Sequence, residues 1–360
     1  MTKFINLHTL ESLGLILLIA FVLTSYIIPK IIKVVNYKEL MDLPNQRSSH
    51  EELTPTFGGI SFFLILIFTL VLIQDFDEDN ISLNIIAGLT ILLFTGLKDD
   101  LVVISLRSKL LGQLLSVGIF LFNTDFYITN LQGFLGFYEI EMYFGIALTT
   151  IIILSIINVF NLIDGIDGLA ASIGVITITI YVVIYYITNE YFFTLIGISL
   201  IGSLMAFLRF NLSSSKKIFM GDTGSLIIGF IVAILTVKFL TLDTNNLNRL
   251  TFIPNNSMFV VASILIFPIF DTMRVLIVRL IKKKNLLLSD KNHTHHMLLK
   301  LGNSHIKASF LISIISLILS ISFIYLTTII NNTWIIAGVY VFTFSLFFGI
   351  FFKSSFQETN

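Results

Sequence analysis

The stretch IIILSIINVFNLIDGIDGLAASIGVITITIYVV, residues 151–183, sets two asparagines and two aspartates between two long apolar runs. An Asp at the centre of a membrane span costs roughly 2.5 to 3.5 kcal/mol on insertion scales. Side chains placed at that cost indicate a function. The stretch therefore predicts two membrane helices that meet at a polar site.

Apolar runs of this kind recur along the whole chain. It has 360 residues, of which 56% are hydrophobic and 12% charged, with a mean hydropathy of +0.94, whereas an average soluble domain is about 25% charged. About 20 apolar residues cross a bilayer as a helix. We predict one all-α membrane domain over 1–360, a polytopic bundle of about eleven spans. They are 10–29, 56–74, 81–97, 108–124, 141–160, 168–187, 192–208, 222–241, 257–281, 309–330 and 333–352.

The basic residues predict the orientation of these spans. With the N-terminus outside, the inside connections and the tail hold 19 Lys and Arg, and the outside holds only Lys3, Lys238 and Arg249. Basic residues collect in cytoplasmic loops, so we expect the N-terminus outside and the C-terminus in the cytoplasm. The first span lacks a strong basic leader and a cleavage site, so we expect a retained helix.

The inside connections also hold five of the six histidines and most acidic residues outside the termini. The bundle can bring all five connections to one membrane face, where we expect the functional site. There is no Cys, so neither a disulfide framework nor a thiolate metal site is available.

The opening stretch repeats Asn158, Asn161, Asp164 and Asp167 at every third residue. On a helix these side chains would form one stripe, and the glycines beside them also permit an unwound turn close to a ligand. The alternative is a polar stripe that only joins helices; two carboxylates make that a costly choice.

GLKDDL (96–101) puts Asp99 and Asp100 side by side at a span end. Adjacent carboxylates raise at least one pKa unless a cation lies between them, so the pair suits a divalent metal, a phosphate ligand with its metal, or proton transfer. A solvated helix end is the alternative.

FMGDTGSL (219–226) puts Asp222 between glycines, directly before a span. Helix N-termini attract anions, and a carboxylate there can hold Mg²⁺ against a phosphate. A simple capping aspartate is the alternative.

DKNHTHHMLLKLG (290–302) gathers His293, His295 and His296. These can carry protons or donate to phosphate oxygens. Zinc would need further ligands, and a plain basic loop is the other reading.

PNQRSSHEELTPTFGG (44–59) offers Arg47 and Thr54 among the donors for a diphosphate, with two glycines for close approach. An ordinary basic loop would look the same. PIFDTMRVLIVRLIKKK (268–284) ends its span with lysines suited to anionic headgroups.

Together these segments, with FLRFN (207–211), resemble the polyprenyl-phosphate N-acetylhexosamine-1-phosphate transferases in order and spacing over most of the chain. The resemblance implies transfer of a sugar-1-phosphate from a UDP-sugar to undecaprenyl phosphate, giving the lipid diphosphate sugar and UMP. It also implies Mg²⁺, with Mn²⁺ as a substitute, at the cytoplasmic face of the inner membrane. No nucleic acid is expected, and a homodimer is left open.

The same resemblance implies roles for individual residues. Asp222 and Asn161 would hold Mg²⁺, and Asp99 and Asp100 would lie beside the acceptor phosphate, with Asp99 as the base or positioning group. The other residues are implied as contacts of nucleotide, sugar or diphosphate: Asp164, Asp167, Phe219, Asn211, His293, His295 and His296, with Lys109, Arg209, Lys216 and Lys217 as helpers. Thr54 and Arg47, read above as donors of the second loop, are expected to bind substrate too.

The sequence departs from the family in its second and last inside loops. The family often has a basic residue where this chain reads TPTFGG and a His-Arg or longer His run where it reads HTHHML. The short insertion after Asp100 favours a UDP-N-acetylhexosamine, GlcNAc first, over the pentapeptide-bearing MurNAc donor.

Two other classes of protein share part of this pattern. The pattern DGIDGLAAS (164–172) opens like a CDP-alcohol phosphatidyltransferase signature but lacks the aspartates that complete it. An ion-coupled transporter would usually show internal repeats and mid-span polar sites, and the carboxylates here lie at span ends.

Overall fold

The computed structural model describes residues 9–42, 54–283 and 293–356, and this part of the chain is almost entirely helical. Two short antiparallel pairs, β1 with β2 and β3 with β4, are its strands. The elements are α1 (Leu10–Lys38), β1 (Met41–Asp42), β2 (Thr54–Pro55), α2 (Gly59–Leu72), η2 (Gln74–Phe76), α3 (Ser82–Val102), α4 (Leu106–Leu121), β3 (Asn130–Phe134), β4 (Phe137–Glu139), α5 (Met142–Ile163), α6 (Leu169–Thr188), α7 (Tyr191–Asn211), α8 (Gly221–Leu240), α9 (Thr244–Leu247), η3 (Pro254–Asn256), α10 (Ser257–Ile264), α11 (Ile266–Ile281), α12 (Thr294–Lys300), α13 (His305–Ile329) and α14 (Thr333–Phe356).

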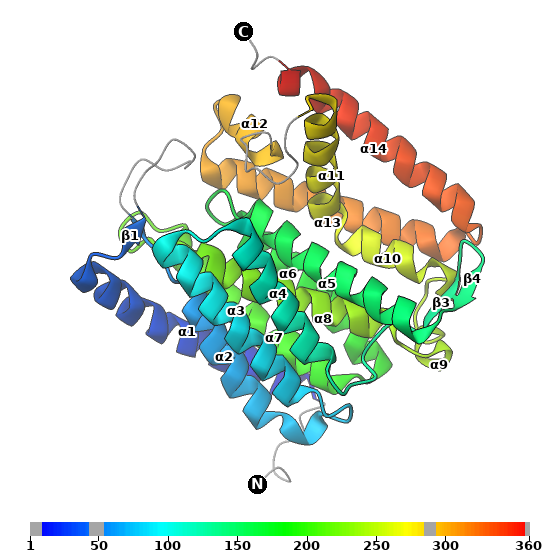
Figure 1. Cartoon of the computed structure of the whole chain (residues 1–360), viewed down its shortest axis with the longest axis horizontal. Helices are drawn as coiled ribbons and strands as arrows, with labels where there is room; N and C mark the ends of the chain where they lie inside the picture. The colour runs from blue at the N-terminus through cyan, green and yellow to red at the C-terminus, as the bar shows by residue number, and fades with distance from the viewer. Residues whose placement is uncertain (1–8, 43–53, 284–292, 357–360) are drawn as a thin grey trace.

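Helix α8 is the core of the bundle (Figure 1). It packs against α2, α3, α5 and α6, and every residue from Thr223 to Val237 is buried. Its sequence IIGFIVAILTV (227–237) is apolar on all sides, which is typical of a helix surrounded by protein. Helix α7 packs against α6, α2 and α1. The first turn of α8 therefore marks the point around which the neighbouring helix ends gather.

The last five helices form a second group, seen in the upper part of Figure 1. Helix α13 packs against α6, α10, α11 and α12, and α14 packs against α11. Residues Pro254–Ile264 and Ile266–Ile281 meet at an angle of 71°. Pro268 explains the break, because proline has no N–H for the carbonyl of Ile264 and its ring clashes with that carbonyl. The predicted span 257–281 is thus a bent pair of helices.

The number of spans is smaller than predicted when length and apolar composition are the criteria. Within the described ranges seven helices qualify, and eight if the bent pair counts as one span. The other three predicted spans coincide with α2, α3 and α4, which are helical but are not among those that qualify. The multi-pass helical bundle is confirmed in this coarser form; eleven spans and the orientation of the termini stay predictions.

Two glycines let α2 and α3 approach the start of α8 at backbone distance. A Cβ at Gly59 would meet the backbone N and Cα of Gly224, and one at Gly96 would meet the backbone of Thr223. Gly59 N also donates to Met220 O at 3.0 Å. Small residues at helix crossings allow this approach in membranes, and here they hold the first turn of α8 in place.

Gly59→Ala should lower the stability of the protein by about 2 kcal/mol, because the new methyl group overlaps backbone that cannot rotate away. Gly118→Ala is the matched control, since nothing lies within 4 Å of its Cβ position on α4, and alanine there should be neutral or stabilising. The apparent melting temperature in detergent measures both. Equal melting temperatures for the two variants would contradict the close crossing.

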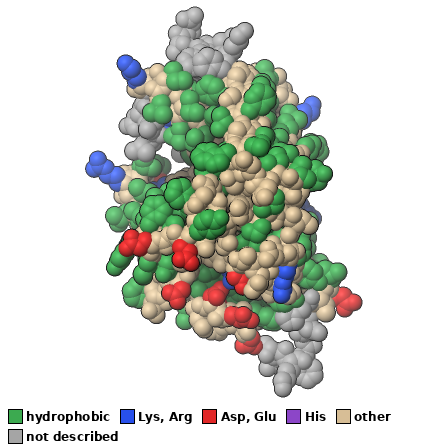
Figure 2. Space-filling view, turned by 90° about the vertical axis from the view of Figure 1, so that its right-hand side faces the viewer, with side chains coloured by type: hydrophobic (Ala, Val, Ile, Leu, Met, Phe, Trp, Pro, Cys, Tyr) green, Lys and Arg blue, Asp and Glu red, His purple; other side chains and the backbone are tan. Residues whose placement is uncertain are grey.

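Charged side chains are unevenly distributed along the bundle. Figure 2 shows Asp and Glu gathered near its lower end, which includes the N-terminal side. Lys238 Nζ on α8 lies 3.1 Å from Asp79 and 3.0 Å from Glu190, so it joins two acidic connections at that end.

Candidate functional site

The polar stretch 158–168 is a helix end followed by a turn. Helix α5 ends at Ile163, and α6 starts after Gly168, whose φ of +79° is a conformation that favours glycine. Asn211 Oδ1 accepts from Gly168 N at 2.6 Å, and Asn211 Nδ2 donates to Ile218 O at 2.9 Å. Asp164 and Asp167 lie in an unwound turn, as the glycines beside them allowed. The prediction that all four polar residues form one stripe on a helix is therefore wrong. Asn211 ties this turn to the segment that leads into α8.

Four helices bring one cluster together around Lys109, which we call the Lys109 cluster. Its Nζ lies 2.9 Å from Asp99 Oδ2, 2.7 Å from Asp222 Oδ1 and 2.9 Å from Asn161 Oδ1. Asn161 Nδ2 donates to Asp222 and, at 2.8 Å, to Ser225 Oγ. The residues come from α3, α4, α5 and α8. Residues of two of the predicted inside connections, 98–109 and 158–168, thus meet the first turn of α8, with one ammonium at the centre of the cluster.

The adjacent aspartates of α3 do different things. Asp100 accepts from Asp222 N at 2.7 Å, from Thr223 N at 3.1 Å and from Thr223 Oγ1 at 2.7 Å. A carboxylate at a helix N-terminus satisfies free N–H groups and complements the helix dipole. Asp100 therefore caps α8 from another helix, and the carboxylate of Asp222 is left to face Lys109.

The two aspartates of the turn have different surroundings. Asp167 lies 2.6 Å from Lys217 Nζ and 3.2 Å from His305 Nδ1. Burial disfavours its charge, but the hydrogen bonds from His305 and Lys217 outweigh burial and hold its pKa below the usual value. Lys217 Nζ also lies 5.2 Å from the ring centre of Phe219. These contacts place Asp167 and Phe219 on one side of the site.

Among the described residues, no cation lies beside Asp164 in this way. Burial, then the charges of Asp222, Asp100 and Asp167, raise the pKa of Asp164 to about 8. The group is therefore largely protonated at neutral pH in the free protein. A protonated carboxyl can donate a hydrogen bond as well as accept one.

The stability of the protein should depend on pH through Asp164. Its folded-state pKa is raised above 3.8, so the wild type loses stability as pH rises from about 4 to about 8, where the unfolded group is ionised and the folded one is not. Asp164→Asn removes this loss. We expect the variant to melt higher than wild type above pH 8 and the difference to vanish near pH 4, measured in a chelating buffer. A difference that does not change with pH would contradict the assignment.

The histidines are anchored by a buried aspartate on α11. Asp271 Oδ2 lies 2.7 Å from His293 Nδ1, and Asp271 Oδ1 accepts from Thr294 N at 2.7 Å. The rings of His293 and His295 are stacked, with centres 5.6 Å apart. His295 packs on Gly165, where a Cβ would meet its Nε2. The histidine segment thus touches the turn between α5 and α6.

His295 is buried and neutral. Burial, together with the neighbouring His296, lowers the pKa of His295 to about 3. Its Nδ1 is buried and has no hydrogen-bond partner among the described residues. A neutral imidazole offers one donor and one acceptor, so His295 is suited to hydrogen bonding rather than to ion pairing.

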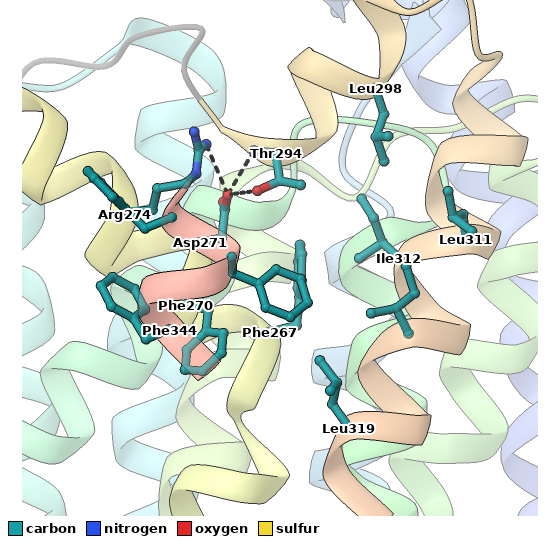
Figure 3. A pocket seen from close by; sticks show the side chains of 13 residues that line it. Phe267, Phe270, Asp271, Arg274, Thr294, Leu298, Leu311, Ile312, Leu319 and Phe344 are labelled. Atoms are coloured by element: carbon teal, nitrogen blue, oxygen red, sulfur yellow. Dashed lines mark hydrogen bonds and ion pairs between the residues drawn. The ribbon is translucent and has the colours of Figure 1, made fainter. Parts of the chain in front are cut away.

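An apolar pocket lies beyond Asp271 (Figure 3). It is lined by apolar side chains of α11, α13 and α14, among them Phe267, Ile312 and Phe344, and Asp271, Arg274 and Thr294 line it as well. Figure 3 shows this polar group at one end, with the apolar side chains of α11 and α13 extending from it. The pocket therefore combines a long apolar wall with a polar end next to the histidines.

The remaining predicted residues lie near the start of α8 or outside the described part. Phe219 N donates to Pro55 O at 2.8 Å, and Phe219 O accepts from Gly58 N at 3.0 Å, which joins the second predicted loop to α8. Thr54 is buried in β2. Arg47 lies outside the described residues.

Sequence reasoning missed several partners. Ser225, His305 and the anchoring role of Asp271 were not predicted for the site, and Lys217 was predicted only as a helper. Ser225 stands three residues after Asp222 in FMGDTGSL, one helical turn further on the same face, so its position was readable. The contact of His305 with Asp167 depends on how α13 packs and had no local signal.

The Lys109 cluster fits a hard divalent metal better than zinc. Among the residues that the structure describes, no three His, Cys, Asp or Glu side chains lie together as a metal site. Two carboxylates and an amide oxygen do converge on Lys109 Nζ. Mg²⁺ is usually held by one or two carboxylates together with substrate phosphates and water, so these donors suit Mg²⁺ that is shared with a diphosphate.

The chain is similar to known proteins over most of its length. Residues 82–240, from α3 to α8, match the family model for glycosyl transferase family 4. A probable undecaprenyl-phosphate N-acetylglucosaminyl 1-phosphate transferase of Bacillus subtilis is 30% identical over 343 residues, 94% of this chain and 89% of the relative. The undecaprenyl-phosphate α-N-acetylglucosaminyl 1-phosphate transferase of Escherichia coli is 26% identical over 292 residues, 80% of this chain and 77% of the relative.

A relative with a different named activity matches over a shorter part of the chain. The phospho-N-acetylmuramoyl-pentapeptide-transferase of Carboxydothermus hydrogenoformans is 33% identical over 201 residues, 50% of this chain and 60% of the relative. The bundle is apolar and helical and has a carboxylate cluster at one end. Together with the match of α3 to α8 to the family model, this defines a membrane-associated glycosyl transferase. The chain belongs to the polyprenyl-phosphate N-acetylhexosamine-1-phosphate transferase family.

Proposed function

We propose that the protein transfers GlcNAc-1-phosphate from UDP-GlcNAc to undecaprenyl phosphate, giving undecaprenyl-diphosphate-GlcNAc and UMP as the first step of a cell-surface glycan. The Lys109 cluster carries this proposal, because a site for two phosphates needs a compact set of cation-binding oxygens and fixed cations. Relatives named for this transfer align over most of the chain.

The donor would bind between the Lys109 cluster and the turn after α5. Asp222 and Asn161 would hold Mg²⁺ with the diphosphate of the UDP-sugar, and Mn²⁺ would substitute. The metal would neutralise charge between the two substrates and on the departing UMP. Lys109 already lies within hydrogen-bond distance of both groups, so it is placed to contact the same phosphates when they arrive.

The other residues of this chain would orient the substrates. Asp167, held by Lys217, and the ring of Phe219 would take the uracil, since an aromatic face suits a planar base. Neutral His295, beside Gly165, would donate to a diphosphate or sugar oxygen, with His293 and His296 next to it. Asp99 would position the acceptor phosphate or take its remaining proton; a phosphate monoester is largely ionised at pH 7.

The acceptor would approach from the bilayer. The pocket in Figure 3 offers an apolar wall for an isoprenoid chain, and its polar end lies next to the histidines. With the orientation expected from the basic residues, this end of the bundle faces the cytoplasm, where UDP-sugars are found. The protein would then be a multi-pass protein of the cytoplasmic membrane.

Transfer can be tested with full-length protein in detergent, undecaprenyl phosphate, Mg²⁺ and a panel of UDP-sugars that includes UDP-MurNAc-pentapeptide. UMP release and the lipid product are followed by mass spectrometry, with reactions lacking acceptor as the control. Product from UDP-GlcNAc alone supports the proposal. Product only from another UDP-sugar would support the same reaction with a different donor. The absence of any product from folded protein would reject the proposed function.

A further inference from the structure

A second polar site lies between α1 and α7. A hollow of about 420 Å³ lies between the two helices. It is lined by Ser25 and Pro29 of α1, by Arg209 and Phe210 at the end of α7, and by Ser213, Ser215 and Lys216 of the segment that follows α7. None of its lining residues is acidic. It therefore presents positive charge and hydroxyl groups without a carboxylate.

This hollow is separate from the Lys109 cluster although the chain passes from one to the other. Ser213 Oγ accepts from Lys216 N at 3.2 Å, which fixes a turn after α7. Lys217 then points to Asp167, 2.6 Å away, whereas Lys216 lines the hollow beside α1. The two neighbouring lysines thus serve different sites.

The two cations of the hollow and one of its hydroxyl groups lack polar partners among the described residues. In the described ranges neither Arg209 nor Lys216 forms an ion pair with a carboxylate; the Arg209 guanidinium lies 6.0 Å from the ring centre of Phe210. The hydroxyl of Ser25 is buried and has no hydrogen-bond partner among these residues. A buried hydroxyl without a partner costs about 1 to 3 kcal/mol, and an anion in the hollow would satisfy it.

The surface around the hollow identifies a lipid as the source of that anion. Val22 and Tyr26 on α1 are 54% and 64% exposed, and Met205 on α7 is 44% exposed. Such apolar side chains on a membrane helix face acyl chains. Lys30 lies 4.5 Å from the ring centre of Tyr26, an arrangement typical of the membrane interface. A ligand here would have a phosphate next to hydrocarbon.

We propose that the hollow between α1 and α7 binds the phosphate headgroup of an anionic phospholipid, which Arg209, Lys216 and the hydroxyl of Ser25 hold. The lipid is a bound partner of the bundle and not a substrate, and its binding does not depend on the proposed transfer reaction. It would join α1 to the loop that leads into α8.

Native mass spectrometry of the full-length protein, titrated with phosphatidylglycerol or phosphatidylcholine, tests this site. Wild type should bind one phosphatidylglycerol more tightly than any phosphatidylcholine. The double variant Arg209→Gln, Lys216→Gln should bind it about thirtyfold more weakly, because each basic residue near an anionic surface contributes about 1 kcal/mol. The matched control, Lys98→Gln with Arg107→Gln, removes two exposed cations elsewhere and should bind as wild type does.

Three results would overturn the proposal. They are equal phosphatidylglycerol binding by wild type and the double variant, an equal loss in the control pair, and displacement of the lipid by glycerol phosphate at the lipid's own affinity. The last would show a site for soluble phosphate. If the double variant does not fold, each single variant should still show about a fivefold loss. Ser25→Ala should weaken binding further without changing net charge.

Discussion

Asp222→Asn should reduce turnover by about a thousandfold or more while the protein stays folded. The substitution keeps the shape of the side chain but removes the charge that faces Lys109 and would bind the metal. Removing one group that stabilises charge in a transition state costs about 10² to 10³ in rate, and a lost metal ligand adds to this. Asp100 caps α8 through the backbone N–H of Asp222, so the helix start should survive.

The measurement is UMP release at saturating Mg²⁺, with melting temperature and size-exclusion profile as checks of the fold. Asp75→Asn is the matched control, because Asp75 is exposed in η2, at the far end of α2 from Phe219. It should have wild-type turnover. Near-normal turnover of Asp222→Asn would show that the metal assignment is wrong.

Lys109→Met should abolish transfer and also change how the protein responds to Mg²⁺. Without the ammonium, Asp99 and Asp222 lose their common cation, and we expect about 2 to 3 kcal/mol lower stability in a chelating buffer. This is less than the 3 to 5 kcal/mol typical of a fully buried pair, because the Asp222 side chain is 31% exposed. In the variant Mg²⁺ no longer competes with the ammonium, so adding it should raise the melting temperature more than in wild type.

Thermal unfolding with and without Mg²⁺ gives this readout independently of activity. Lys98→Met is the control, since Lys98 is exposed on the same helix as Asp99 and its loss should leave both melting temperatures unchanged. A variant that is as stable as wild type without Mg²⁺, and no more responsive to it, would mean that Lys109 does not hold the carboxylates together.

The sequence predicted the parts of the site that local patterns encode. The energetic cost of placing Asp164 and Asp167 next to apolar spans predicted a polar site. The glycines around them predicted that an unwound turn was possible. Pro268 was a readable signal for the bend at Leu265, yet the apolar run around it looked like one span. The β3–β4 hairpin was not predicted, because its short strands lie in a connection with no clear alternation.

Other features depend on three-dimensional packing and could not be predicted. Asp99 and Asp100 are adjacent in sequence, so they looked like a functional pair. Successive residues on a helix point about 100° apart, which sends Asp100 to α8 and Asp99 to Lys109. The central position of Lys109 likewise depends on where α4 lies beside α3 and α5, and nothing in the sequence next to it indicates this.

The enclosure of α8 has a consequence for the order of synthesis. Helices α2, α3, α5 and α6, which pack most extensively against it, precede it in the chain, and α10, which packs against it less, follows. The four earlier helices leave the ribosome first, so we expect them to assemble with an open slot that α8 then enters. A chain stopped shortly after residue 241 should therefore already resist proteolysis across α2 to α8, whereas a chain stopped before residue 221 should be cut readily. In the growing chain, the arrival of α8 would be the step that completes the Lys109 cluster.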